Sequence, residues 1–382
     1  MGFHEFSSPY DWSRIAAYKR TAKAAFGGMI DLSVGSPVDP VPDSVRKALA
    51  VAANDPNAYG YPATAGTADL RAAIAEWFSA ARNVDLQAIH ADVVPTVGSK
   101  EGVALMASLL HFGEDDVVVQ PKVSYPTYEI GTQLAGAQVL NVDDVADVAS
   151  WRNVPGVKAV WVNSPCNPTG EVYSAERMAG IVAAAREIGA VVLSDECYAL
   201  MQWRGATNSA DDDPLQSTPC ALRSDVCAGS AEGVLVLYSL SKQSNMAGYR
   251  TAFIAGDESL IASMSAYRKQ IGQIIPGPVQ AAMAAGLRDL ESVKVQHARY
   301  RERLGVLVSA LRAYGYCTDM PDGALYVWVR AKSGDCWTDM EQLAKIGIIA
   351  SPGEFYGAPE CLRFSATASD EAIASAAERL AR

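Results

Sequence analysis

The sequence lacks paired cysteines, long apolar runs and an excess of positive charge. Its seven cysteines are scattered without a C-x-x-C pair, so neither a zinc site nor a disulfide framework is expected, and a reducing cytoplasm fits. No apolar run has membrane-spanning length, and the early charges Glu5, Asp11 and Arg14 argue against a signal peptide. With 43 acidic and 32 basic residues, the formal net charge of -11 argues against a nucleic-acid or anionic-membrane partner.

The 382 residues exceed one typical hydrophobic core, so about two domains are expected. From Asp92 onward short apolar runs alternate with helical patterns, which is typical of a mostly parallel sheet covered by helices. The strand-like runs are 93–97, 117–120, 159–162, 191–194, 234–238 and 251–255. A long helical region from 277 to 313, broken near Leu290, predicts the connector to a second domain, and the polar segment 205–229 predicts a surface excursion.

The stretch VLVLYSLSKQSNMAGYRTAFIAGD, residues 234 to 257, is the most informative part of the chain. Lys242 follows an apolar strand and lies among the hydroxyls of Ser239 and Ser241, with Arg250 eight positions further on. Burial disfavours the charged form of a lysine and frees its amine for imine chemistry. A lone lysine in such a loop is more often solvated, so the neighbouring motifs decide between the two interpretations.

Other polar groups follow other strands, at the sheet edge where open α/β folds bind ligands. Gly98, Ser99 and Lys100 open a helix, where free backbone amides and the helix dipole suit a phosphate. The run 159–162 leads into Asn-Pro-Thr-Gly at 167–170, and the run 191–194 leads into Asp-Glu-Cys-Tyr at 195–198. Together they supply an amine, a carboxylate and anion donors, the groups that pyridoxal phosphate needs.

These motifs, S-x-S-K with the following arginine, N-P-T-G and D-E-x-Y, resemble those of the class I and II aminotransferases, fold-type I enzymes that use pyridoxal 5'-phosphate. The resemblance implies an α/β fold, with a mostly parallel seven-stranded sheet between helices in a large domain and a smaller α/β domain. The expected division is residues 1–50 as an N-terminal segment of the small domain, 51–289 as the large cofactor-binding domain, and 290–382 as the rest of the small domain. A cytoplasmic homodimer without a metal is implied.

The resemblance also assigns catalytic and cofactor roles at matching positions. Lys242 would hold the cofactor covalently, Asp195 would pair with its pyridinium nitrogen, and Tyr198 would bind its phenolic oxygen. Asn167 would contact the same oxygen, and Tyr125 would stack on the ring. The residues expected to hold the phosphate are Gly98, Ser99, Lys100, Ser239, Ser241 and Arg250, with Tyr61 reaching the phosphate of the neighbouring subunit.

Three residues are expected to bind the substrate. Arg363, in the run Cys-Leu-Arg-Phe-Ser, lies where the family places the arginine that binds the α-carboxylate. Gly35 matches a glycine whose amide touches the same carboxylate, and Asn167 completes the set. The implied reaction is ping-pong amino transfer, in which the amine of Lys242 moves the α-proton of an amino acid and a 2-oxo acid takes the amino group.

A narrower resemblance concerns the N-terminal half. The runs DLSVGSPVDPVP, YPATAGTADLRAAI and PTVGSKEGVALMASLL are similar to actinobacterial succinyldiaminopimelate aminotransferases, which exchange amino groups between glutamate and N-succinyl-2-amino-6-oxopimelate in lysine synthesis. Such a substrate carries a second, distal acid, for which Lys100, Arg268 and Lys269 are open choices. Transamination of LL-diaminopimelate, aspartate or alanine, a carbon-sulfur lyase of the same fold, and a non-catalytic ligand sensor are the alternatives.

Overall fold

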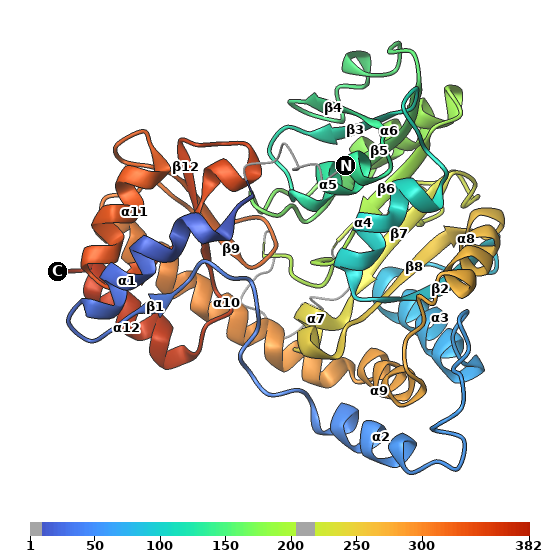
Figure 1. The fold of residues 1–382 in the computed structure, drawn as a ribbon, viewed down its shortest axis with the longest axis horizontal. Coiled ribbons are helices and arrows are strands. Elements are labelled where there is room, and N and C mark those ends of the chain that lie inside the picture. Colours follow the sequence, from blue (N-terminus) through green and yellow to red (C-terminus); the bar gives the residue numbers. More distant parts are fainter. Residues whose placement is uncertain (1–9, 204–217) are drawn as a thin grey trace, which may run out of the picture.

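The computed structural model describes residues 10–203 and 218–382, arranged as two lobes (Figure 1). The larger lobe is built on a seven-stranded sheet in the order β2-β8-β7-β6-β5-β3-β4. All neighbouring pairs are parallel except those of β8, which runs antiparallel to β2 and to β7. The strands are β2 Ala91–Val97, β3 Val117–Pro121, β4 Gln138–Val142, β5 Val157–Asn163, β6 Val191–Asp195, β7 Val234–Ser239 and β8 Thr251–Asp257.

Helices cover both faces of this sheet because the central strands are apolar on both sides. In β5, Val160 and Val162 pack into the core under one set of helices, while Ala159 and Trp161 point to the opposite core. The first core includes side chains of α3 Ala68–Arg82, α6 Ala175–Glu187 and α9 Gly277–Arg288. The second includes side chains of α4 Ser99–Leu109, α5 Thr127–Leu134 and α8 Glu258–Gln270.

The smaller lobe joins the two ends of the described chain. β1 Ile30–Asp31 pairs in parallel with β10 Ile348–Ile349, and α1 Ala16–Ala24 packs against α11 Cys336–Lys345. A second sheet, β11-β12-β9, is antiparallel. Its strands are β9 Tyr326–Arg330, β11 Ser351–Pro352 and β12 Cys361–Ser365, flanked by α10 Leu290–Ala313 and α12 Asp370–Leu380. In contrast, α2 Asp43–Ala53 packs on α9. The division of the chain at residues 50 and 290 stays a prediction.

The expected fold class is confirmed, and so is the expected break in the long helical region. α9 ends at Arg288 and α10 begins at Leu290, with the carboxylate of Asp289 accepting the backbone N–H of Ser292 at 3.0 Å as an N-cap. Strand β4 was not among the expected runs. Within the described part of the chain, no helix is both long and apolar enough to cross a membrane.

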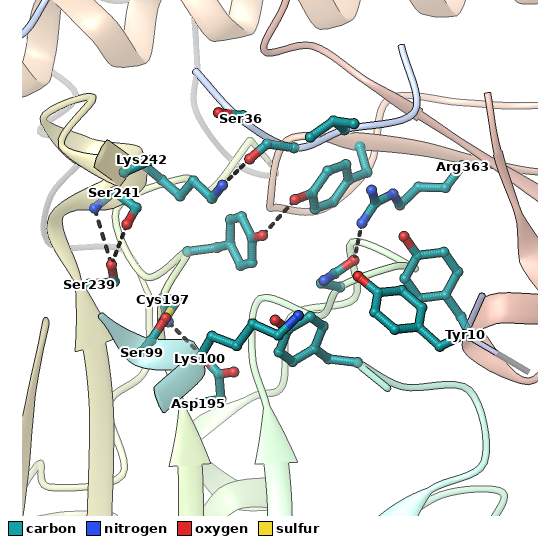
Figure 2. A pocket seen from close by; sticks show the side chains of 18 of the residues that line it. Tyr10, Ser36, Ser99, Lys100, Asp195, Cys197, Ser239, Ser241, Lys242 and Arg363 are labelled. Atoms are coloured by element: carbon teal, nitrogen blue, oxygen red, sulfur yellow. Dashed lines mark hydrogen bonds between the residues drawn. The ribbon is translucent and has the colours of Figure 1, made fainter. Parts of the chain in front are cut away.

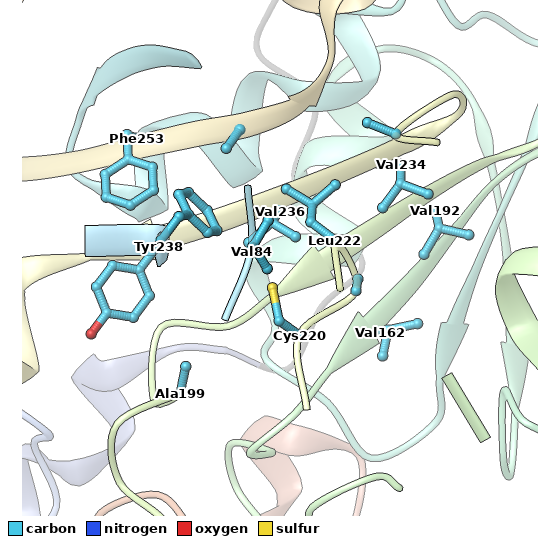
Figure 3. Packing of buried hydrophobic residues seen from close by; sticks show 14 of the residues in the cluster. Val84, Val162, Val192, Ala199, Cys220, Leu222, Val234, Val236, Tyr238 and Phe253 are labelled. Atoms are coloured by element: carbon cyan, nitrogen blue, oxygen red, sulfur yellow. The ribbon is translucent and has the colours of Figure 1, made fainter. Parts of the chain in front are cut away.

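The expected surface excursion at 205–229 is wrong for its second half. Residues 204–217 lie outside the described residues, but Cys220 and Leu222 are buried in the same core cluster as Val234 and Val236 of β7 (Figure 3). Arg82 of α3 fixes this segment, because its guanidinium donates to the carbonyl of Pro219 at 2.9 Å and pairs with buried Glu196 at 2.8 Å. The expectation was wrong because it rested on the polar composition of the whole segment, which includes a short apolar stretch near its middle.

Candidate active site

A cavity of about 370 Å³ lies where the parallel strands of the large sheet end and the small lobe begins (Figure 2). In this view Lys242 and Arg363 flank the cavity on opposite sides, and Asp195 lies at its base. The structure brings together most of the residues expected from the sequence: Gly35, Ser99, Lys100, Tyr125, Asn167, Asp195, Tyr198, Ser239, Ser241, Lys242, Arg250 and Arg363 all line it.

One wall of the cavity is an anion cradle. α4 begins at Ser99 directly after Gly98, whose φ of 77° and close contact with the Arg250 guanidinium leave no room for a Cβ atom. On the other side Ser239 donates its hydroxyl to that of Ser241 at 2.7 Å. A helix N-terminus, two hydroxyls and a guanidinium converge here, and this donor set fits a phosphate.

Lys242 lies beside the cradle on the short helix α7 Leu240–Gln243, which Ser239 caps at its N-terminus. Its ammonium group donates to the carbonyl oxygen of Gly35. Burial is the main cause of the lowered pKa of Lys242. Tyr326 and Cys197 oppose the shift, while the positive charges of Arg363 and Arg250 add to it. This environment favours the neutral, nucleophilic amine.

Asp195 is the last residue of β6 and is almost fully buried. Its carboxylate accepts a hydrogen bond from the hydroxyl of Tyr128 at 2.8 Å and from the backbone N–H of Cys197 at 3.1 Å. Tyr128 is itself held by stacking on Trp161, with the ring centroids 4.4 Å apart. Burial raises the pKa of Asp195, although both hydrogen bonds oppose the shift. Both partners are neutral, so a cationic ring nitrogen beside this carboxylate would relieve the cost of its burial.

Arg363 lies on β12 and is 4% exposed. Its guanidinium donates to the amide oxygen of Asn167 at 2.7 Å and to the carbonyl of Ser33 at 2.8 Å. It also lies 4.0 Å from the ring centroid of Tyr326 and 4.8 Å from that of Tyr356. Because Nε has no hydrogen-bond partner among the residues that the structure describes, the group keeps capacity for an acceptor. A buried planar cation of this kind is suited to a carboxylate.

The mouth of the cavity contains residues that sequence reasoning missed. Tyr10 and Trp12 line it, and the ammonium of Lys100 lies 5.4 Å from the ring centroid of Tyr10. Tyr356 lines the cavity as well, but it is buried beside Arg363. Lys100 is exposed, so its side chain points to the mouth. The apolar spacing around Tyr10 predicts only a helix, and no sequence signal connects it to residues a hundred positions away.

Two expected residues are not part of this cavity's lining. Gly98 lies behind it against Arg250, while Tyr61 is fully exposed on the loop between α2 and α3. Of the other candidate cations, Arg268 is fully buried and pairs with Glu101 at 2.8 Å. Lys269 is exposed on α8 and does not line the cavity. Lys100 is therefore the candidate cation that the cavity contains.

Comparison with known proteins places this site in a family. Residues 27–380 match the family described as aminotransferase class I and II. The chain belongs to this family. It is accordingly a class I aminotransferase that depends on pyridoxal phosphate, and its cradle, lysine and buried carboxylate fit that cofactor.

Two relatives and one solved structure are similar to this aminotransferase over nearly its whole length. It is 40% identical over 97% of its length to a 4-dedimethylamino-4-oxo-anhydrotetracycline transaminase of Streptomyces rimosus, covering 98% of that protein. It is 39% identical over 97% of its length to a probable aminotransferase of Mycobacterium tuberculosis, covering 84% of it. A solved structure of a probable N-succinyldiaminopimelate aminotransferase from Thermus thermophilus is 28% identical, with a TM-score of 0.82 and coverage of 97% and 99% of the two chains.

Proposed function

We propose that this enzyme transfers an amino group between glutamate and N-succinyl-2-amino-6-oxopimelate, as in the succinylase branch of lysine synthesis. The observation that carries the proposal is one cavity that, besides the proposed cofactor residues Lys242 and Arg250, contains two further cationic side chains, buried Arg363 inside and exposed Lys100 at the mouth. A long substrate with an acid at each end matches that arrangement. The likeness to the probable N-succinyldiaminopimelate aminotransferase supports the same substrate class.

The cofactor residues have the roles that the sequence motifs imply. Bound pyridoxal phosphate acts as an electron sink for the pair released at the substrate's α-carbon. Lys242 holds it, Asp195 keeps its ring nitrogen protonated, and Tyr198 with Asn167 binds its phenolic oxygen. Tyr125 packs against its ring. The residues that hold its phosphate are Gly98, Ser99, Lys100 through its backbone, Ser239, Ser241 and Arg250.

The chain's own residues then perform three tasks. Arg363, with Asn167 and the amide of Gly35, holds the α-carboxylate and so fixes which bond of the α-carbon faces Lys242. Once the amino group of the substrate has displaced Lys242 from the cofactor, the freed amine, whose pKa is lowered by burial, would accept the α-proton at Nζ and deliver it to the C4′ carbon of the cofactor. The second half of the cycle runs in reverse with a 2-oxo acid, for which we propose 2-oxoglutarate.

The distal acid is assigned to Lys100. Its ammonium lies over the ring of Tyr10 and the residue is exposed, so a carboxylate reaching the mouth meets a cation without displacing a buried ion pair. Arg268 would have to break its pair with Glu101 to play this role.

We also propose that the active enzyme is a homodimer, and a cytoplasmic location stays a prediction. Tyr59 and Tyr61 are 90% and 102% exposed on one loop, and Val51 of α2 is 75% exposed nearby in the chain. These two exposed tyrosines and the exposed valine favour a surface that is buried against a second copy of the chain.

The test is to mix inactive Lys242→Ala chains with Tyr61→Ala chains. Part of the activity should be restored if each site uses both subunits, whereas no restoration would contradict a shared site.

A second candidate substrate is a bulky cyclic ketone. The cavity is lined by the rings of Tyr10, Trp12 and Tyr356, and a relative at 40% identity is named as a transaminase of an anhydrotetracycline. Flat aromatic side chains bind a flat ring system with little loss of side-chain entropy. This alternative predicts that the second cation at the mouth is dispensable.

The test is steady-state turnover with 2-oxoglutarate as the acceptor. We expect glutamate to form fastest from N-succinyl-LL-diaminopimelate, with LL-diaminopimelate, aspartate and alanine far behind. An equal or higher rate with alanine or aspartate would overturn the substrate proposal and leave the aminotransferase standing. A parallel reaction without any acceptor, assayed for pyruvate, is the control for lyase chemistry and should stay blank.

A further inference from the structure

The hydroxyl group of Tyr326 occupies a central position that the cofactor motifs do not account for. Tyr326 is the first residue of β9 and is 2% exposed. Its oxygen lies 2.6 Å from the hydroxyl oxygen of Tyr198, and its ring lies 4.0 Å from the guanidinium of Arg363. One side chain of the small lobe therefore touches both the proposed carboxylate receptor and the proposed cofactor ligand.

Strand register explains the contact with Arg363. In the antiparallel pair β9 and β12, Tyr326 is opposite Ser365 and Arg363 is opposite Trp328, so Tyr326 and Arg363 are diagonal neighbours on one face. The guanidinium lies over the ring at a distance typical of a cation–π contact. Tyr356 flanks the same cation at 4.8 Å, but its hydroxyl lies 3.1 Å from that of Ser351 and not at Tyr198.

Gly35 confines the Tyr326 hydroxyl from another side. A Cβ atom at position 35 would overlap the hydroxyl oxygen of Tyr326, so only glycine fits this backbone position. The carbonyl of Gly35 is the acceptor for Lys242. The hydroxyl of Tyr326 is thus held between the loop that contacts the catalytic lysine and the phenol of Tyr198.

A proton count gives the direction of the bond between the two tyrosines. Each phenol has one proton to donate. In the proposed function, on which this inference rests, Tyr198 donates its proton to the phenolic oxygen of the cofactor. The hydrogen bond at 2.6 Å then requires Tyr326 to be the donor and Tyr198 the acceptor. We propose that Tyr326 is a positioning residue that donates to Tyr198 and thereby strengthens and orients the hydrogen bond from Tyr198 to the cofactor.

The expected consequence is a shift in the pH dependence of the cofactor's visible spectrum. Hydrogen bonds in a chain polarise one another, so removing the first donor weakens the second by about 10–30%. The negative charge on the phenolic oxygen is then less stabilised, and the proton on the nitrogen that links the cofactor to Lys242 is held more tightly. The spectral midpoint should therefore rise by about 0.3 pH unit in Tyr326→Phe, against about one unit in Tyr198→Phe.

The decisive experiment is an absorbance titration of the holoenzyme between acid and alkaline pH, without substrate. The set contains the native protein, Tyr326→Phe, Tyr198→Phe and the double variant, with Tyr356→Phe as the matched control for loss of a buried hydroxyl near Arg363. We expect a raised midpoint in Tyr326→Phe, no further rise in the double variant over Tyr198→Phe, and the native midpoint in Tyr356→Phe.

Two results would overturn the proposal: a native midpoint in Tyr326→Phe while Tyr198→Phe is shifted, or shifts that simply add in the double variant. No shift in Tyr198→Phe would instead refute the cofactor placement on which the inference rests. Since no substrate is present, the outcome does not depend on the substrate proposal.

A second measurement separates the hydroxyl of Tyr326 from its ring. Tyr326→Phe keeps the ring beneath Arg363, so the KM for glutamate should change less than twofold. Tyr326→Leu removes the ring as well and should raise that KM by about fivefold, in line with loss of a cation–π contact. An equal rise in both variants would contradict the division of roles and would assign the hydroxyl to carboxylate binding.

Discussion

The inner wall and the mouth of the cavity are built in different ways. Asp195, Ser239 and Lys242 lie at or just beyond the ends of buried strands, and hydrogen bonds fix each of them. At the mouth, Tyr10 precedes the first helical turn and Lys100 is exposed at the start of α4. The inner wall is held by these hydrogen bonds and specified by contiguous motifs, whereas the mouth is assembled from distant parts of the chain.

This difference separates the chemistry from the choice of substrate. A pre-organised inner wall stabilises charge that develops during reaction, so changes there should lower kcat. Contacts at the mouth hold the far end of the substrate in every state, so changes there should alter KM and the preference among substrates. Variants deep in the cavity should therefore lower kcat, and variants near the mouth should change KM and substrate preference.

The largest effect is expected at Lys242. In the proposed roles Lys242 is both the covalent attachment of the cofactor and the proton carrier, so Lys242→Ala should lower turnover by at least about a thousandfold and abolish the visible absorbance of the linked cofactor. Spectra and initial rates check this. The matched control is Lys269→Ala on the outside of α8, which should keep both properties; a Lys242→Ala enzyme that kept them would refute the site.

The next effect is expected at Asp195. Asp195→Asn keeps the shape and one acceptor but removes the negative charge that we propose pairs with the ring nitrogen, so kcat should fall by about a hundred- to a thousandfold. Cofactor binding should weaken less, because the phosphate cradle is untouched. The measurements are kcat and the cofactor dissociation constant of the same variant. A kcat within a few-fold of the native value would contradict a role for the Asp195 charge in the chemical step.

A smaller effect is expected at the boundary between the two regions. Arg363→Lys keeps a cation but loses the planar fork that faces a carboxylate, so kcat/KM should fall by about ten- to a hundredfold for every amino donor alike. The measurement is kcat/KM for glutamate and for alanine. A loss confined to one donor would mean that Arg363 selects among substrates and does not serve as the common receptor.

The smallest effect is expected at Lys100. Because an exposed ion pair contributes at most about 1 kcal/mol, Lys100→Ala should lower kcat/KM for the succinylated donor by about fivefold and leave alanine unchanged. High salt should reduce the difference between the two enzymes. Equal losses for both donors would place Lys100 with the phosphate and not with the distal acid.

The sequence predicts the inner wall well because short contiguous motifs carry it. Asp195, Asn167 and Lys242 each follow an apolar strand, and parallel strands bring their ends to one edge. Tyr326 looked like an ordinary strand residue, since only its pairing across to β12 places it on Arg363. Tyr128 likewise became informative only when folding set its hydroxyl against Asp195.

The parts of the fold that were missed have physical reasons as well. β4 is an edge strand with Gln138 and Asn141 exposed, so its sequence lacks the apolar run of the central strands. The buried segment around Cys220 and Leu222 is short and follows a polar stretch, and its burial depends on Arg82 from a distant helix. In both cases the structure of the segment depends on tertiary contacts that its local composition does not reveal.

Single-turnover half-reactions measure whether one common inner wall works with a selective mouth. The purified, cofactor-loaded enzyme is mixed in turn with N-succinyl-LL-diaminopimelate, glutamate, aspartate and alanine, and the loss of visible absorbance is followed. We expect fast loss of absorbance with the succinylated donor and with glutamate, and slow loss with aspartate and alanine. Equal rates for all four, or faster loss with alanine or aspartate, would contradict a mouth that selects a long diacid.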